Sequence, residues 1–203
     1  MLQCYRGVTQ IDIRPMTSRD IDEVVTLQIK FLDGSLVTDL GPRFLGSFHR
    51  AALQHSDTRA FVATDRGSIV GLAVGSLDVA KFNGYVRPRI LFPLAAAIAS
   101  PARWRLGFAL ARTLVERDPA PVIPAELLLL VVDDRCRQRG IGRTLLEKLE
   151  RSLASAAITQ YRVAVRSHLD VARAFYTALG FAFEQELAVL GRPMTYLTKD
   201  IAA

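Results

Sequence analysis

The chain has 203 residues, of which 50% are hydrophobic and 23% are charged. This length and composition suit one domain spanning residues 1–203 and exclude a disordered chain. The formal net charge of +6 favours an anionic partner, but the basic residues are dispersed and form no run with interleaved aromatic residues, so we expect no nucleic-acid partner.

The first part of the chain predicts alternating strands and helices. Its opening residues lack the apolar segment of a signal peptide, which indicates a cytoplasmic protein. Ser18 is a candidate N-cap, and apolar residues follow it at helical spacing. Pro42 suits the first turn of a second helix. We expect strands at residues 11–14, 59–64 and 68–76, a helix after Ser18 and a helix at residues 42–54.

Residues 80–124 interrupt this pattern. They contain six prolines and two apolar stretches that predict helices at about 91–100 and 102–117. We interpret the segment as a helical insertion that packs beside the core. Three roles stay open: a structural lid, a wall of a site for an anionic acceptor, or a basic surface that contacts a membrane through residues 86–117.

The last part of the chain predicts a buried strand followed by further helices and strands. Residues 125–132 form a nearly continuous apolar run, typical of a central strand that is buried on both faces. Gly180 suits the position after a helix C-terminus. We expect helices at residues 142–155 and 171–179, and strands at residues 162–165, 181–190 and 194–200.

A turn rich in glycine and arginine joins the buried strand to the next helix. The first N–H groups of a helix have no intrahelical partner, and the helix dipole adds positive potential, so such a turn binds anions. Gly140 and Gly142 lack Cβ atoms that would keep a phosphate away from the backbone. Charge and a hydroxyl are added by Arg137, Arg139, Arg143 and Thr144.

Other phosphate-binding and metal-binding patterns do not fit. A dinucleotide fingerprint of the form GxGxxG fails because Leu145 stands where the third glycine or alanine belongs. A Walker A loop needs GxxxxGK followed by serine or threonine, and the sequence contains no such run. The cysteines form no CxxC motif and no cluster with histidine, so we expect no metal site.

The turn resembles the acyl-CoA-binding motif (R/Q)xxGx(G/A) of the GCN5-related N-acetyltransferase (GNAT) family. Arg137, Gly140 and Gly142 occupy its three defined positions, and an apolar strand precedes it as in the family. Downstream, residues 172–181 resemble the AxxFYxxxGF element of the family. The chain also opens like the family, with Ile13, Arg14, Pro15 and Asp20, and the resemblance covers residues 11–78 and 125–200.

The resemblance implies a mixed α/β fold, the GNAT fold, with a central and mostly antiparallel sheet of about seven strands flanked by helices. The fourth and fifth strands would splay apart. It also implies acetyl-CoA as the donor, with the pantetheine arm inserted like an extra strand beside the backbone of Val131 and Val132. The pyrophosphate would be held by the amides of Gln138, Arg139, Gly140, Ile141, Gly142 and Arg143.

Acyl transfer to an amine needs a base for the amine proton, donors for the tetrahedral oxyanion and an acid for the leaving thiolate. The resemblance implies Tyr176 as the acid, with its hydroxyl directed at the thioester sulfur. Glu126 stands where some family members keep a glutamate base, and burial on this strand would suit it to that work. A backbone N–H near Val132 is a candidate oxyanion donor.

The chain departs from the family at Leu169, where many members have an asparagine that contacts CoA. We expect that contact to be absent or replaced. The acceptor implied is a primary amine, which we expect to belong to a small molecule, and a homodimer stays open. The alternative from another class is a non-catalytic sensor or interaction protein that binds acyl-CoA on the same fold.

Overall fold

The computed structural model describes residues 11–32, 38, 40–98, 122–189 and 192–201. A seven-stranded sheet forms its centre, in the order β1-β2-β3-β4-β5-β7-β6. All neighbouring strands are antiparallel except β4 and β5, so the predicted mixed sheet is confirmed. The strands are β1 (Ile11–Pro15), β2 (Thr58–Asp65), β3 (Ser68–Ser76), β4 (Glu126–Val132), β5 (Gln160–Arg166), β6 (Ala182–Val189) and β7 (Arg192–Asp200).

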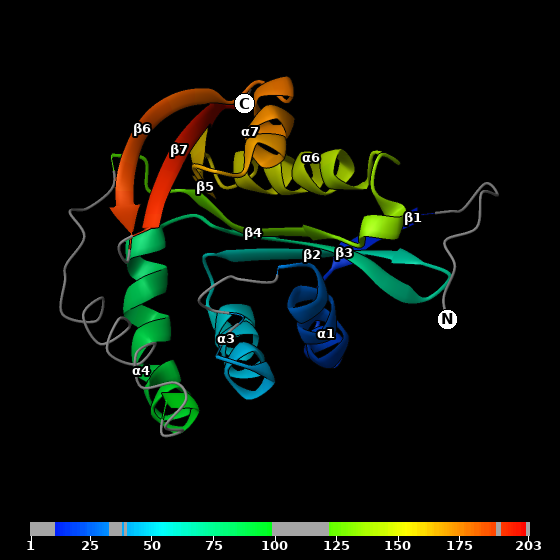
Figure 1. Cartoon of the computed structure of the whole chain (residues 1–203), viewed down its shortest axis with the longest axis vertical. Coiled ribbons are helices and arrows are strands. Elements are labelled where there is room, and N and C mark those ends of the chain that lie inside the picture. Colours follow the sequence, from blue (N-terminus) through cyan, green and yellow to red (C-terminus); the bar gives the residue numbers. More distant parts are fainter. Residues whose placement is uncertain (1–10, 33–37, 39, 99–121, 190–191, 202–203) are drawn as a thin grey trace.

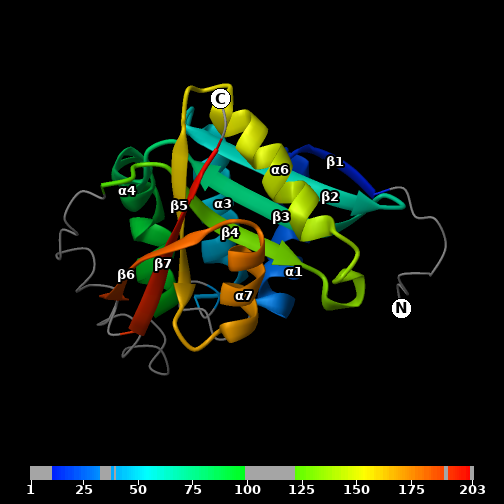
Figure 2. The same ribbon diagram turned by 90° about the horizontal axis from the view of Figure 1, so that it is seen from above.

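Helices cover both faces of the sheet (Figure 1). The helices of the described residues form two groups, one on each face, and the second group packs over the strands beside the glycine-rich turn (Figures 1 and 2). The first face carries α1 (Ile21–Phe31), α3 (Pro42–Gln54) and α4 (Val79–Ile98), and the second carries α6 (Ile141–Ala154) and α7 (Asp170–Ala178).

The alternation of side chains along the strands creates two cores. On β2, Phe61 and Ala63 join the core under α6, whereas Val62 between them joins the core with α1 and α3. This is the two-sided burial expected of central strands covered by helices on both faces. The sheet is therefore fixed in register, because a slip of one residue would exchange the two cores.

Two glycines of β3 let α6 lie close to the sheet. A Cβ atom at Gly71 would stand 2.9 Å from Leu145 Cδ1 of α6, and one at Gly75 would stand 2.9 Å from Leu149 Cδ1. Both distances are shorter than van der Waals contact, so a larger residue would push the helix or its leucines aside. The glycines thus set the height of α6, and with it the position of the turn at its N-terminus.

The insertion begins with one long helix, which corrects the prediction. The first helix was expected at about residues 91–100, but α4 starts at Val79 and runs through the two prolines at 88 and 93. Val79, Phe82 and Val86 are buried at helical spacing, and this apolar stripe outweighs the local effect of proline. Phe82 and Val86 pack against α3, so this part of the insertion lies beside the core as expected.

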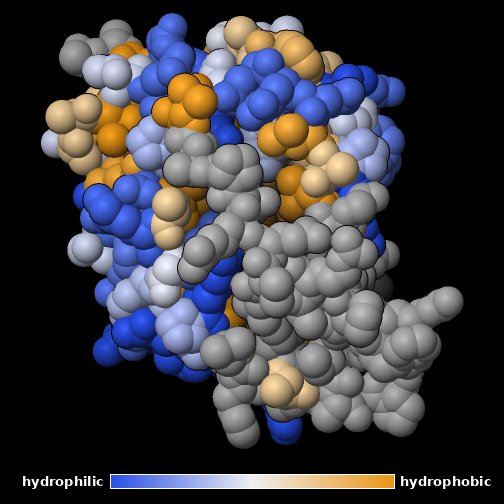
Figure 3. All heavy atoms as spheres, turned by 90° about the vertical axis from the view of Figure 1, so that its left-hand side faces the viewer, coloured by the Kyte–Doolittle hydropathy of each residue, from blue (hydrophilic) through white to orange (hydrophobic). Residues whose placement is uncertain are grey.

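The second predicted helix, at 102–117, lies outside the described residues, as does most of the segment expected to contact a membrane. None of the helices formed by the described residues combines the length and apolar character of a bilayer-spanning segment. On the face shown in Figure 3, described hydrophobic residues form separate patches between hydrophilic ones.

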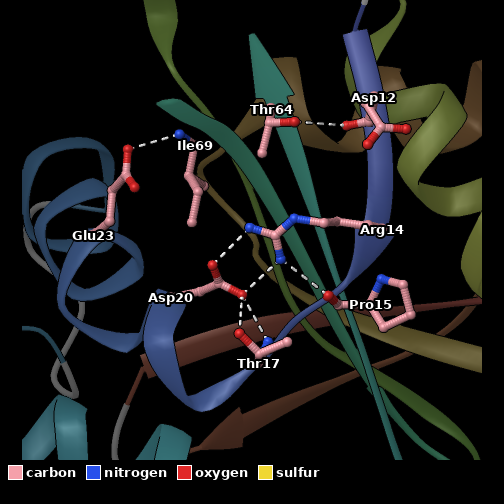
Figure 4. Close-up of polar contacts among 8 residues, drawn as sticks. All are labelled: Asp12, Arg14, Pro15, Thr17, Asp20, Glu23, Thr64 and Ile69. Carbon is pink, nitrogen blue, oxygen red and sulfur yellow. Dashed lines mark hydrogen bonds and ion pairs between the residues drawn. The ribbon is translucent and has the colours of Figure 1, made fainter. Parts of the chain in front are cut away.

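An ion pair near the start of the chain joins β1 to α1 (Figure 4). The Arg14 guanidinium donates to both carboxylate oxygens of Asp20, each at 2.7 Å. The Thr17 N–H and hydroxyl also donate to Asp20, at 2.7 and 2.9 Å, which completes a capping box before α1. The Arg14 bonds are the main reason that the pKa of Asp20 lies well below its usual range.

Asp20→Asn is expected to lower the free energy of unfolding by about 2 kcal/mol at neutral pH, because charge-assisted hydrogen bonds are lost. Arg14 is partly exposed, so solvent screening keeps the loss modest. Since folding depresses the pKa of Asp20, its contribution is complete above the ordinary value of 3.8 and is lost as the pH falls below it. Urea denaturation at neutral pH and near pH 3 measures both effects.

The matched control is Asp12→Asn, because Asp12 is exposed on β1, the strand that carries Arg14. This variant should keep the wild-type stability at neutral pH. The stability of Asp20→Asn should approach that of the wild type at acid pH. Equal unfolding free energies of Asp20→Asn and wild type at neutral pH would contradict the prediction.

Candidate functional site

The parallel strands β4 and β5 separate after a short stretch of pairing. They are in register only at Glu126 with Arg162 and at Leu127 with Val163. Directly after this point the pairing of β4 with β3 shifts, and Leu128 is the additional residue. The bulge bends β4 where it leaves β5, and Figure 2 shows the two strands diverging from there. The predicted splayed pair is therefore present.

One edge of β4 faces the gap between the two strands. The Asp133 N–H bonds to the Val70 carbonyl of β3 at 2.9 Å, so the backbone of Asp133 points towards β3. Backbone groups alternate in direction along a strand, which turns those of Val131 to β3 as well and those of Leu130 and Val132 to the gap. Of the two residues predicted to bind pantetheine, Val132 is the one whose backbone faces the gap.

The turn after β4 is built on Asp133. Its buried carboxylate accepts a hydrogen bond from the Arg135 N–H at 3.0 Å and from Arg135 Nε and Nη2 at 3.0 and 2.6 Å. These bonds from Arg135 hold the pKa of Asp133 below its usual range. They also cap the short helix η3 (Asp134–Cys136) and fix the path of the chain into the turn.

The next residues present a row of backbone donors. Gln138 and Gly140 have positive φ angles of 61° and 78°, a conformation that turns neighbouring N–H groups to one side. The Thr144 N–H bonds to the Gly140 carbonyl and so closes the first turn of α6. Within the described chain, no hydrogen bond is made by the amides of Gln138, Gly140, Ile141, Gly142 and Arg143.

The polar side chains of the turn differ in what they contact. Arg137 and Arg143 are exposed and have no ion pair with a described residue. Arg139 instead forms an ion pair with β2, where its Nη1 lies 4.0 Å from Asp65 Oδ2. The Thr144 hydroxyl donates to the Gly140 carbonyl at 3.1 Å. The side chains best placed to add charge for an anion are thus Arg137 and Arg143.

A ring contact joins the turn to α7. A Cβ atom at Gly142 would stand 3.2 Å from Phe175 Cζ and 3.8 Å from Val132 Cγ2, so glycine lets these three residues meet. The rings of Phe175 and Tyr176 are 5.2 Å apart, edge to face. The predicted turn, Val132 and Tyr176 therefore come together on the side where α7 lies over the gap (Figures 1 and 2).

Tyr176 is 7% exposed, and its ring lies 5.2 Å from that of Phe181. Burial raises the pKa of Tyr176 above the ordinary 10.0, because the phenolate would lose its hydration. The hydroxyl is accordingly protonated at neutral pH. It makes no hydrogen bond to a described residue, so its proton is free to be donated to a ligand.

Glu126 lies at the other end of β4, about 20 Å from Val132 by strand rise. Its Oε2 accepts a hydrogen bond from Arg162 Nε at 2.8 Å and forms an ion pair with Nη2 at 2.8 Å. The two side chains are only 13% and 10% exposed. The Arg162 guanidinium also stacks on the Tyr196 ring at 4.6 Å. Sequence analysis had not assigned Glu126 a cationic partner.

Leu169, which stands where many relatives have asparagine, is 42% exposed before α7. It brings no polar group to the gap. Among the described residues, no group of three or more acidic, histidine or cysteine side chains is placed to hold a metal ion.

Solved structures with the same architecture are acetyltransferases, at identities that show the fold alone. The ribosomal-protein-S18-alanine N-acetyltransferase from Escherichia coli is 14% identical, with a TM-score of 0.60 and 96% of both chains covered. An N-acetyltransferase from Staphylococcus aureus Mu50 is 14% identical, with a TM-score of 0.63 over 95% of this chain and 99% of that one. An acetyltransferase from Thermus thermophilus is 18% identical, with a TM-score of 0.60 over 94% and 96%.

The sequence itself matches the profile of the acetyltransferase (GNAT) family over residues 32–181, which is most of the chain and includes the turn, the splayed strands and α7. The same region holds the open edge of β4 and the row of amides at the start of α6. Sequence profile, fold and local geometry agree, and the protein belongs to the GNAT acetyltransferase family.

Proposed function

We propose that the protein transfers the acetyl group of acetyl-CoA to a primary amine of a small molecule. The observation that carries the proposal is the row of backbone amides at the start of α6, which lies at the open end of the gap between β4 and β5. Helix N-termini of this kind bind pyrophosphate. The unpaired edge at Leu130 and Val132 suits an extended amide-bearing arm such as pantetheine, which can add to a strand edge through backbone hydrogen bonds.

The chemistry proposed is direct transfer. The amine nitrogen attacks the thioester carbon, a base takes the amine proton, and the carbon–sulfur bond breaks as a proton reaches the sulfur. Tyr176 is the proposed acid, because its hydroxyl is protonated at neutral pH. A backbone N–H of β4 that faces the gap, near Val132, is the proposed donor to the tetrahedral oxyanion.

Glu126 is the proposed base; because it lies about 20 Å from Val132 along β4, it would take the amine proton through a chain of water molecules. The contact with Arg162 holds the carboxylate in place, although a neighbouring cation weakens a carboxylate as a base. Arg162 is a positioning residue in this proposal, since it holds the carboxylate from the neighbouring strand.

The test is a thiol-release assay with acetyl-CoA and a panel of amines that includes polyamines, amino sugars, aminoglycosides, amino acids and peptides. We expect acetyl-CoA to raise the melting temperature of the protein, and at least one small amine to release the free thiol. Stabilisation without release by any amine would favour the alternative of a non-catalytic acyl-CoA sensor. If acyl-CoA gave no stabilisation, donor binding would be excluded.

The paired charges of Glu126 and Arg162 give a further prediction. Arg162→Gln is expected to lower the free energy of unfolding by about 3 kcal/mol, because it removes the cation that pairs with the largely buried carboxylate of Glu126. Glu126→Gln is expected to lower kcat by about 100-fold with little change in the KM for acetyl-CoA. Denaturation and steady-state kinetics measure the two effects.

The double variant Glu126→Gln/Arg162→Gln separates the two roles. It has no unpaired charge, so its stability should recover in part, while kcat should stay as low as in Glu126→Gln. If kcat recovered together with stability, Glu126 would be a structural residue and a different base would be required.

A further inference from the structure

A cavity of about 590 Å³ lies at the edge of the sheet, away from the glycine-rich turn. Its size is within the range of small-molecule sites. It is bordered by the end of β1, the start of β2, the end of α3 and the last two turns of α6. The lining residues are Pro15, Met16, Leu53, Thr58, Arg59, Ala60, Phe61, Lys148, Arg151 and Ser152.

The cavity exists because β1 is shorter than its neighbour. β1 pairs with β2 only from Phe61 to Asp65, which leaves Thr58, Arg59 and Ala60 without a neighbouring strand on that side. Beyond Pro15 the chain makes one more bond to the edge, from the Met16 N–H to the Ala60 carbonyl, and then turns away. The result is a notch in the sheet edge, with α6 on one side.

Three cations line the notch, and its lining contains no carboxylate. Arg59 Nη1 donates to the carbonyls of Ser56 and Thr58 at 2.7 and 3.0 Å, and Arg151 Nε donates to the Glu147 carbonyl at 3.2 Å. These bonds hold the guanidinium groups without neutralising them. None of Arg59, Lys148 and Arg151 has an ion pair with a described residue.

The neutral groups of the notch suit a ligand with two parts. Thr58 lines the notch, and its hydroxyl is buried and has no hydrogen-bond partner in the described structure. Ser152 supplies a second hydroxyl at the cationic side. The apolar lining consists of Phe61, which belongs to the core under α6, and of Met16 and Leu53, which pack with the core on the other face of the sheet.

The dipole of α6 does not account for the positions of all three basic side chains. A basic residue in the last turn of α6 offsets the helix dipole, which accounts for Arg151. It does not account for Lys148 one turn earlier or for Arg59 on a strand. Lys148, Arg151 and Ser152 also share one side of α6, at spacings of three and four residues.

We propose that the notch is a second ligand site, for a small organic anion whose phosphate or carboxylate contacts Arg59, Lys148 and Arg151 and whose apolar part contacts the apolar lining of the notch. It is distinct from the turn at the start of α6, because Gly142 and Arg151 are about 14 Å apart along the helix axis. It does not depend on the activity proposed above.

Phenyl phosphate and inorganic phosphate are suitable probes. We titrate each compound into the full chain in the presence of saturating CoA and follow backbone amides by NMR. Inorganic phosphate measures binding to the cationic side chains alone, and phenyl phosphate measures the added contribution of the apolar lining. The amides of Thr58, Arg59 and Ser152 are expected to shift, and phenyl phosphate should bind about tenfold more tightly than inorganic phosphate. Benzoate in a third titration distinguishes a carboxylate from a phosphate site.

Lys148→Gln/Arg151→Gln should weaken phenyl phosphate binding at least about tenfold. Arg137→Gln/Arg143→Gln, which removes two arginines at the other end, should leave it unchanged. Both pairs are exposed or half-buried, so the fold is expected to persist, and the NMR spectra report this directly. Shifts confined to residues 137–143, or an unchanged affinity in Lys148→Gln/Arg151→Gln, would overturn the proposal. Binding of CoA is measured from the amides of residues 137–143. A failure of CoA to bind is therefore distinguished from a failure of the notch to bind phenyl phosphate.

Discussion

Gly140→Asp is expected to weaken acetyl-CoA binding by at least about 100-fold, or about 2.7 kcal/mol. The new carboxylate would stand beside the amides proposed to hold the pyrophosphate, and two like charges a few ångströms apart repel strongly. The fold itself should tolerate the change, because no atom lies within 4 Å of a Cβ built at Gly140. The positive φ angle of 78° adds a strain of about 1 kcal/mol for any other residue.

Gly67→Asp is the matched control for this experiment. Gly67 also has a positive φ angle, 83°, and no atom within 4 Å of a built Cβ, but it lies in the turn between β2 and β3. The two variants should lose similar stability by urea denaturation, while only Gly140→Asp should lose binding by isothermal titration calorimetry. Similar affinities of the two variants would show that the turn does not hold the donor.

Tyr176→Phe is expected to lower kcat by about 100-fold while the affinity for acetyl-CoA is kept. The ring packing on Phe175 and Phe181 does not involve the hydroxyl, so phenylalanine preserves the contacts and removes only the proton donor. Since burial raises the pKa of Tyr176, the wild-type enzyme should lose no activity through this residue as the pH rises from neutral to about 9. Steady-state kinetics over that pH range test both statements.

A second buried tyrosine supplies the control. Tyr161 also lies 5.2 Å from Phe181, but its hydroxyl donates to Glu150 at 2.6 Å instead of facing a ligand. Tyr161→Phe should therefore cost about 1–2 kcal/mol of stability and leave kcat nearly unchanged. Equal kcat values for Tyr176→Phe and wild type would exclude Tyr176 as the acid.

The parts of the fold that depend on local patterns could be predicted from the sequence. The apolar run before the turn became β4, and Gly180, with its positive φ angle of 89°, follows α7 as expected of a helix terminator. The start of α4 differs from the prediction, because the buried stripe of Val79, Phe82 and Val86 outweighs the effect of the prolines. Phe82 and Val86 stabilise the helix through burial against α3, a tertiary effect that local propensity does not contain.

The candidate site also contains parts that local sequence predicts and parts that depend on tertiary structure. The amides of the turn follow from a strand, two glycines and a helix in sequence, and so they were predictable. The pairing of Glu126 with Arg162 depends on the register of parallel strands joined through α6, which no spacing along the chain reveals. The bulge at Leu128 lies in a run of four leucines, where nothing distinguishes the extra residue from its neighbours.

The long connection between β3 and β4 has a consequence for how the chain folds. In the sheet these strands are antiparallel neighbours, yet residues 77–125, including α4, separate them. Closing such a loop costs about 2 kcal/mol more in chain entropy than closing a hairpin of roughly four residues. The central pair of the sheet therefore has to form late or be guided by α4 docking on α3. A chain with a short turn from Ser76 to Glu126 should fold faster, even though it would leave Ala51 and Ala52 uncovered.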